Sequence, residues 1–135
     1  MGNNAGDHNK MRSAQIVLGP IAATNAKDMF FYRANRSFRI VGMHAALQTG
    51  STSATLQIEK SVGGAVAIGS GVDLLATEVD TTAVTGLAIA TPHELDLVTT
   101  AGALELSEGD WLAMDWSGDV SSLVGLFVTI DLEPL

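Results

Sequence analysis

The C-terminal stretch 106–132 limits the fold more than any other part of the chain. Its segment 111–116 is mostly apolar, a short turn follows at 117–119, and the remainder alternates apolar and polar residues. Successive side chains of a strand point to opposite faces, so apolar residues at every second position indicate a strand on a core. That row consists of Val124, Leu126, Val128, Ile130 and Leu132. We therefore predict that the chain ends in two strands joined by a tight turn.

The preceding residues show similar short apolar runs, divided by small turn residues. Turn signals at intervals of roughly 8–12 residues are typical of β-sandwiches and jelly rolls. We predict an all-β protein, an antiparallel β-sandwich of jelly-roll type, with one domain over 13–135 and a flexible N-terminal arm over 1–12. Further strands are expected at 13–19, 37–48, 54–60, 84–90, 95–99 and 104–106, with a short helical turn at 72–78.

Two of these segments allow a prediction about which side chains are buried. Segment 37–48 carries apolar residues at both parities, which is typical of a central strand covered on both faces. Segment 54–60 alternates strictly, so that Leu56 and Ile58 are predicted to face the core while Gln57 and Glu59 face outward.

Charge is distributed unevenly along the chain. The net charge is −8, yet all seven Lys and Arg residues lie within 1–60, where three acids oppose them. Residues 61–135 hold the other twelve acids and no Lys or Arg. An acidic chain of this kind does not suit sequence-independent nucleic-acid binding, which needs a basic surface. The asymmetry has two interpretations: strands of both halves interleave, or a basic side of the molecule docks on an acidic partner.

The residues that usually carry catalysis or bind metals do not form a recognisable pattern. The chain has no cysteine, and its histidines, His8, His44 and His93, lack the spacing of metal ligands. Asp110, Asp115 and Asp119 lie close in sequence without the spacing of a calcium loop. An acid pair of the glycosidase type stays open, although a sugar cleft needs aromatic platforms and only 5% of the residues are aromatic. We predict a non-enzyme that needs no cofactor and no metal.

The sequence also bears on where the protein is found. Its apolar runs are far shorter than the roughly 20 residues of a membrane helix, and the polar start, 1–7, is unlike a signal peptide. We therefore expect no membrane partner and folding in the cytoplasm.

Basic residues near the N-terminus are the first candidates for binding a partner. Arg33, Arg36 and Arg39 lie within seven positions of one another beside a predicted turn. Either they are solvated charges or they meet carboxylates of another protein. Lys10 and Arg12 of the arm are further candidates, since an arm without apolar anchors is expected to order only against a partner.

The two tryptophans give the last candidate. Trp111 and Trp116 are five positions apart on one predicted strand and must point to opposite faces. Leu112 and Met114 share the parity of Trp116, which places Trp116 in the core and Trp111 at the surface. Tryptophan is enriched among the residues that anchor protein interfaces, so a surface Trp is a candidate for binding a partner. The alternatives are that a loop of the same chain covers Trp111 or that a bulge at 109–110 shifts the parity.

The order of these segments resembles the small jelly-roll decoration, or cement, proteins of tailed-phage heads. The resemblance covers residues 38–130 and is carried by 37–40, 55–60, 67–71, 74–76 and 106–115, followed by the Val-rich last strand. It implies a non-enzymatic protein on the exterior of the capsid, bound across joints between copies of the major capsid protein. It also implies a homo-oligomer, with a trimer as the first expectation and a dimer as the second.

Two other classes of protein share such strand patterns. One is a receptor- or carbohydrate-binding jelly-roll module of a phage tail or baseplate, which should show a concave aromatic face. The other is a small hydrolase, which should show convergent acids or histidines in a pocket.

Overall fold

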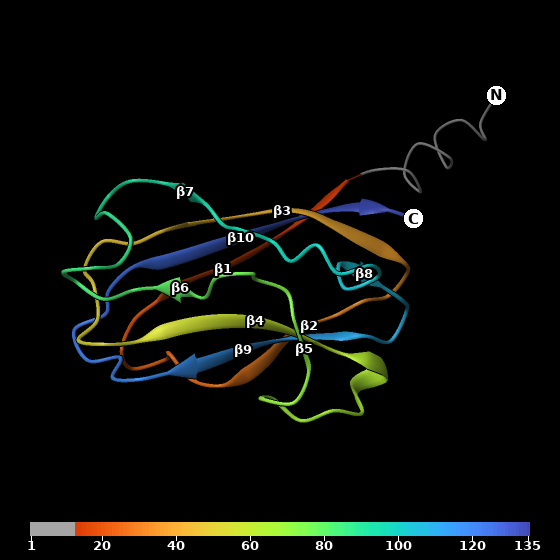
Figure 1. Ribbon diagram of the computed structural model, residues 1–135, viewed down its shortest axis with the longest axis horizontal. Helices are drawn as coiled ribbons and strands as arrows, with labels where there is room; N and C mark the ends of the chain where they lie inside the picture. The colour runs from red at the N-terminus through yellow and green to blue at the C-terminus, as the bar shows by residue number, and fades with distance from the viewer. Residues whose placement is uncertain (1–12) are drawn as a thin grey trace.

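Two antiparallel β-sheets packed face to face make up the part of the chain that the computed structural model describes, residues 13–135 (Figure 1). Sheet A contains, in spatial order, β1 (Ala14–Ile21), β10 (Leu126–Pro134), β3 (Phe38–Ala46) and β7 (His93–Glu94), with β8 (Glu105–Leu106) also paired to β3. Sheet B contains β2 (Met29–Arg33), β9 (Trp111–Ser117), β4 (Thr55–Ser61) and β5 (Val72–Asp73), with β6 (Val79–Asp80) also paired to β4.

The chain alternates between the sheets as it passes through the long strands. It crosses from β1 to β2, back to β3, over to β4, and finally from β9 to β10. Because all pairs of named strands are antiparallel, this is a jelly-roll-like β-sandwich, and the predicted fold class is confirmed. Among the described residues, the only helical element is the single 3-10 turn η1 (Val62–Gly64). The predicted flexible arm, 1–12, lies outside the described residues.

The predicted closing hairpin is wrong, although both of its strands exist. β9 lies in sheet B between β2 and β4, whereas β10 lies in sheet A between β1 and β3. Segment 118–125 carries the chain from one sheet to the other. Gly118 and Gly125 have φ of +86° and +69°, which turns the backbone out of the β region at both ends of this connection.

The apolar row of β10 forms the centre of sheet A's inner face. Leu126, Val128, Ile130 and Leu132 are fully buried, as predicted. Val124 is 45% exposed because β10 begins only at Leu126, after the left-handed Gly125. The strand pairs with β1 on one side and with β3 on the other. The last strand of the chain therefore lies beside the first.

β3 is not covered on both faces, which corrects the prediction for 37–48. Its register against β10 shifts between Ile40 and Gly42, so Val41 is an extra residue. The bulge exchanges the parity that faces inward: Ile40 and Met43 are both buried, while Val41 is 50% exposed. The apolar residues of 37–48 therefore occur at both parities because the bulge changes which positions face the core, and not because both faces of β3 are covered.

The connections between β4 and β9 also differ from the prediction. The segment 72–78 is not helical, and 84–90 and 95–99 form no long strands. Instead 74–76 pairs with 96–98, through Ala76 N–H to Asp96 O and Val98 N–H to Leu74 O, both at 2.9 Å. These bonds join the two sheets along one side of the sandwich.

The outer face of β4 is covered rather than solvated. Gln57 and Glu59 point outward as predicted, but they are only 4% and 3% exposed. The segment after β4 folds back over them. The Gln57 amide donates to Leu75 O and accepts from Leu75 N–H, and Glu59 accepts from Gly69 N–H at 2.9 Å.

No helix in 13–135 is long and apolar enough to cross a membrane.

Candidate functional site

Trp111 is the centre of a shallow aromatic cleft on the outer face of sheet B. It begins β9, opposite Arg33 of β2 and Ser61 of β4. Its ring meets that of Phe30 edge to face, with 5.9 Å between centroids and 73° between planes. Gly64 closes the other side, and these three residues line a hollow of about 280 Å³, which we call the Trp111 cleft.

Gly64 is the residue on which the shape of the cleft depends. A Cβ on Gly64 would lie 2.8 Å from Trp111 Cδ1 and 2.9 Å from Nε1, well inside van der Waals contact. Its φ of +70° also favours glycine. The indole is therefore held between Phe30 and a bare backbone, and η1 covers it in part.

Asp110 fixes the loops around the cleft. It is 5% exposed, and its carboxylate accepts hydrogen bonds from Gly63 N–H and Ser107 N–H, each at 2.9 Å. Its backbone carbonyl accepts from Ala34 N–H at 2.8 Å. In the sequence Asp110 stands out only as one of several neighbouring acids. A carboxylate just before an apolar strand and after a Ser-Glu-Gly turn is the signal that could have identified it as a loop anchor.

The opposite orientation of the two tryptophans is confirmed, with one change. Trp116 faces inward and packs against the core, together with the buried Leu112 and Met114. Trp111 faces outward, and Gly64 and Phe30 cover part of its ring. Trp116 is itself half-buried because it lies near the end of β9, where its backbone N–H donates to Asp28. The alternative that a loop of the same chain covers Trp111 therefore holds in part.

The three predicted arginines lie on sheet B, in a turn and on sheet A. Arg33 is exposed at the end of β2, where it pairs with Trp111 of β9, and it lies beside the cleft without lining it. Arg36 lies in the turn that follows, with its guanidinium carbon 5.5 Å from the centre of the Phe38 ring. Arg39 lies on sheet A and pairs with Glu133 at 3.3 Å and Glu105 at 3.5 Å. Lys10 and Arg12 lie outside the described residues.

A carboxyl pair lies further along the outer face of sheet B. Burial, followed by the neighbouring Asp115 carboxyl, raises the pKa of Glu59 above its ordinary value. Such a pair can share a proton, which is the chemistry of an acid pair in catalysis. Here Glu59 is 3% exposed beneath the 62–71 loop, so a substrate has no room beside it.

The described histidines do not form a metal centre. His44 lies on the outer face of sheet A, with Nδ1 3.7 Å from Asp131 and Nε2 3.9 Å from Glu94. His93 lies in β7, and His8 is outside the described residues. Within 13–135 no group of three or more His, Asp or Glu side chains has the arrangement of a metal site.

Comparison with known proteins gives little similarity. No family model and no curated protein sequence matches the chain. Among solved structures, the chain superposes on part of a protein from the Gx strain of infectious bursal disease virus. The superposition has a TM-score of 0.39 with 14% identity and covers 90% of this chain and 32% of that one. With so low a TM-score, the likeness supports neither a shared fold nor a shared function.

Proposed function

We propose that this protein is a non-enzymatic capsid decoration, or cement, protein that binds the outside of a phage head and stabilises contacts between major capsid proteins. The observation that carries the proposal is the Trp111 cleft. A partly exposed Trp held in one orientation, with Arg33 beside it, is the combination of residue types enriched in interface hot spots. The loops around it are fixed by Asp110, so little order has to be gained on binding.

Charge suggests which part of the surface meets the capsid protein. Arg33 and Arg36 lie at the end of the sandwich where β2 turns toward β3, and they suit carboxylates on a partner. Arg39, the third arginine, pairs with Glu105 and Glu133 on sheet A. Lys10 and Arg12 are proposed to add further contacts with the partner. The protein would then be a component of the virion exterior, made in the host cytoplasm.

The proposal is tested by binding of purified protein to heads that lack it. We expect Phe30→Ala and Trp111→Ala to weaken binding at least tenfold, roughly the effect of losing 1.4 kcal/mol, without loss of the fold. Phe127→Ala is the matched control, since Phe127 is 40% exposed on sheet A and Phe30 is 39% exposed on sheet B. Equal binding by all three variants, or no binding by the natural protein, would refute the proposal.

The same cleft favours a second function, a receptor- or carbohydrate-binding module of a phage tail or baseplate. The hollow of about 280 Å³ is close to the lower limit of small-ligand sites, and an indole face can stack on a sugar ring. If this function holds, a glycan should quench the fluorescence of Trp111, and Trp111→Phe should abolish the quenching. Such quenching in a protein that does not bind heads would establish this function instead.

A further inference from the structure

β1 is a free edge of sheet A along its first five residues. Ala14 to Leu18 pair in an unbroken register with β10, from Leu132 to Val128. The register shifts only after Leu18, before Ile21. Among the described strands β1 has no other partner, so alternate backbone N–H and C=O groups point away from the sheet.

This edge lacks the features by which proteins usually protect a strand from pairing. Charged side chains, prolines and bulges are the common ones. Residues 13–26 contain no charged residue, and Pro20 and the bulge come only after the regular part of β1. Val17 is 57% exposed on it. The edge of sheet B is better protected: β2 has five residues, a register shift between Phe30 and Tyr32, and Lys27 and Arg33 near its ends.

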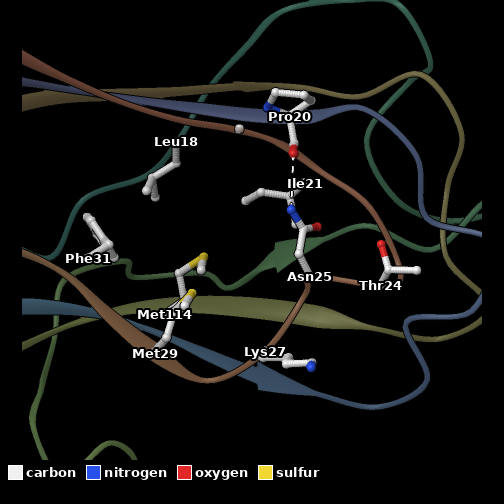
Figure 2. A pocket seen from close by; sticks show the side chains of 10 residues that line it. Leu18, Pro20, Ile21, Thr24, Asn25, Lys27, Met29, Phe31 and Met114 are labelled. Atoms are coloured by element: carbon white, nitrogen blue, oxygen red, sulfur yellow. Dashed lines mark hydrogen bonds between the residues drawn. The ribbon is translucent and has the colours of Figure 1, made fainter.

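The sandwich is also hollow behind this edge. Figure 2 shows a groove between the sheets, with Leu18 on the β1 side and Phe31 on the β2 side. Its volume is about 420 Å³, and the buried Ile21 and Met114 lie at its base. The side chain of Asn25 holds one end in shape, because its Oδ1 accepts from Ala22 N–H at 2.6 Å. An added strand along β1 would cover the half-buried Ile16 and Leu18 beside this groove.

We propose that β1 pairs antiparallel with β1 of a second copy of the chain, about a two-fold axis at Ile16. A second copy meets β1 without placing charged side chains opposite one another, because 13–26 is uncharged although each chain has a net charge of −8. The pattern of β1 is also self-complementary. When 14–18 of two copies pair antiparallel about Ile16, the inward-facing residues of both copies lie on the same face of the joined sheet.

This register predicts specific cross-strand neighbours. Ile16 lies opposite Ile16 of the second copy, Ala14 opposite its Leu18, and Gln15 opposite its Val17. The two copies of sheet A then form one continuous sheet. The inference does not rest on a role in the virion, since every feature used belongs to the isolated chain.

Association is measured first, by sedimentation equilibrium of the full chain over a wide concentration range. We expect a reversible shift from one to two chains per particle. Val17→Lys places a charge on the edge and should weaken association at least tenfold. Val41→Lys is the matched control, since Val41 is 50% exposed on the same sheet but lies in the inner strand β3. A chain that stays monomeric, or a dimer that Val17→Lys leaves intact, overturns the proposal.

Disulfide trapping then tests the register, and the natural absence of cysteine makes single substitutions specific. Directly opposed residues of antiparallel strands have Cβ atoms about 4.5–5.5 Å apart, near enough for a disulfide after a small adjustment. Ile16→Cys should cross-link to itself. Gln15→Cys and Val17→Cys should each cross-link poorly alone and well when mixed. Efficient cross-linking at another position of the chain, with none at Ile16, would show that a different surface pairs and would overturn the proposal.

Discussion

The two long sides of the sandwich are built differently. On the side of β5, β6 and β7, segments 74–76 and 96–98 are bonded to each other and, through Leu74 N–H to Ile58 O and Leu95 N–H to Met43 O, to both sheets. On the side of β1 and β2, no backbone hydrogen bond joins the two strands anywhere in the described structure, and a groove lies between them. We call these the closed side and the open side.

Charge follows the same division. Segment 62–106, which contains every short strand of the closed side, holds six acids and no Lys or Arg. Segment 13–33, which forms the open side, holds two basic residues and one acid. The closed side pairs its backbone groups and carries only acidic charge, whereas the open side leaves a strand edge and apolar area uncovered. The comparison suggests that stability is concentrated on one side and association on the other.

The largest expected effect is the difference between two leucine truncations. Leu74 is fully buried on the closed side, and Leu74→Ala should cost about 2–5 kcal/mol of unfolding free energy. Leu18 is half-buried on the open side, and Leu18→Ala should cost about 1 kcal/mol in the monomer. Chemical denaturation of dilute protein measures both. Equal costs would remove the distinction between the sides.

The two tryptophans should differ in a similar way. Trp116→Ala removes a ring packed on the core and should cost about 3 kcal/mol. Trp111→Ala should cost about 1 kcal/mol or less, because the ring contacts mainly Phe30 and Gly64 on the outer face. Thermal unfolding of the two variants checks the order. If Trp111→Ala is the more damaging change, the cleft supports the fold rather than a partner.

The smallest expected effect is a gain in stability on the outer face of sheet B. A raised Glu59 pKa means that the folded state binds this proton more tightly than the unfolded state. Stability is therefore lost as the pH rises from the ordinary glutamate range through the raised pKa. Glu59→Gln keeps an acceptor for Gly69 N–H and removes the charge, so it should stabilise the fold near neutral pH and flatten the pH dependence.

Unfolding of Glu59→Gln should be compared with that of Glu108→Gln from about pH 4, near the ordinary pKa of glutamate, up to about pH 8. Glu108 is exposed and provides the control for loss of one negative charge. A destabilised Glu59→Gln at neutral pH would mean that the carboxylate is needed in its ionised form.

Sequence patterns predicted the fold class because the inner faces follow simple alternation. The row of β10 and the opposite orientations of Trp111 and Trp116 depend only on the period of a strand. The same reasoning failed where a backbone irregularity intervenes. The bulge at Val41 exchanges the inward parity of β3, and the covering of Glu59 depends on a loop that shows no periodicity.

The candidate site was only partly predictable for a related reason. Trp111 was found from parity and Arg33 from charge, but their juxtaposition across β9 and β2 is a matter of register between distant segments. Phe30 and Gly64 were missed, since nothing local in the sequence shows that either lies against an indole. The ion pairs of Arg39 were not predictable, because its two glutamates are 66 and 94 positions away along the chain.

Amide hydrogen exchange of the full chain at low and high protein concentration tests the central claim, that the open side is the associating side, most directly. We predict that the amides of 14–18 that point away from β10 exchange at least roughly tenfold more slowly at high concentration, while those of 74–76 and 96–98 do not change. Added protection confined to the closed side, with none in β1, would contradict the account.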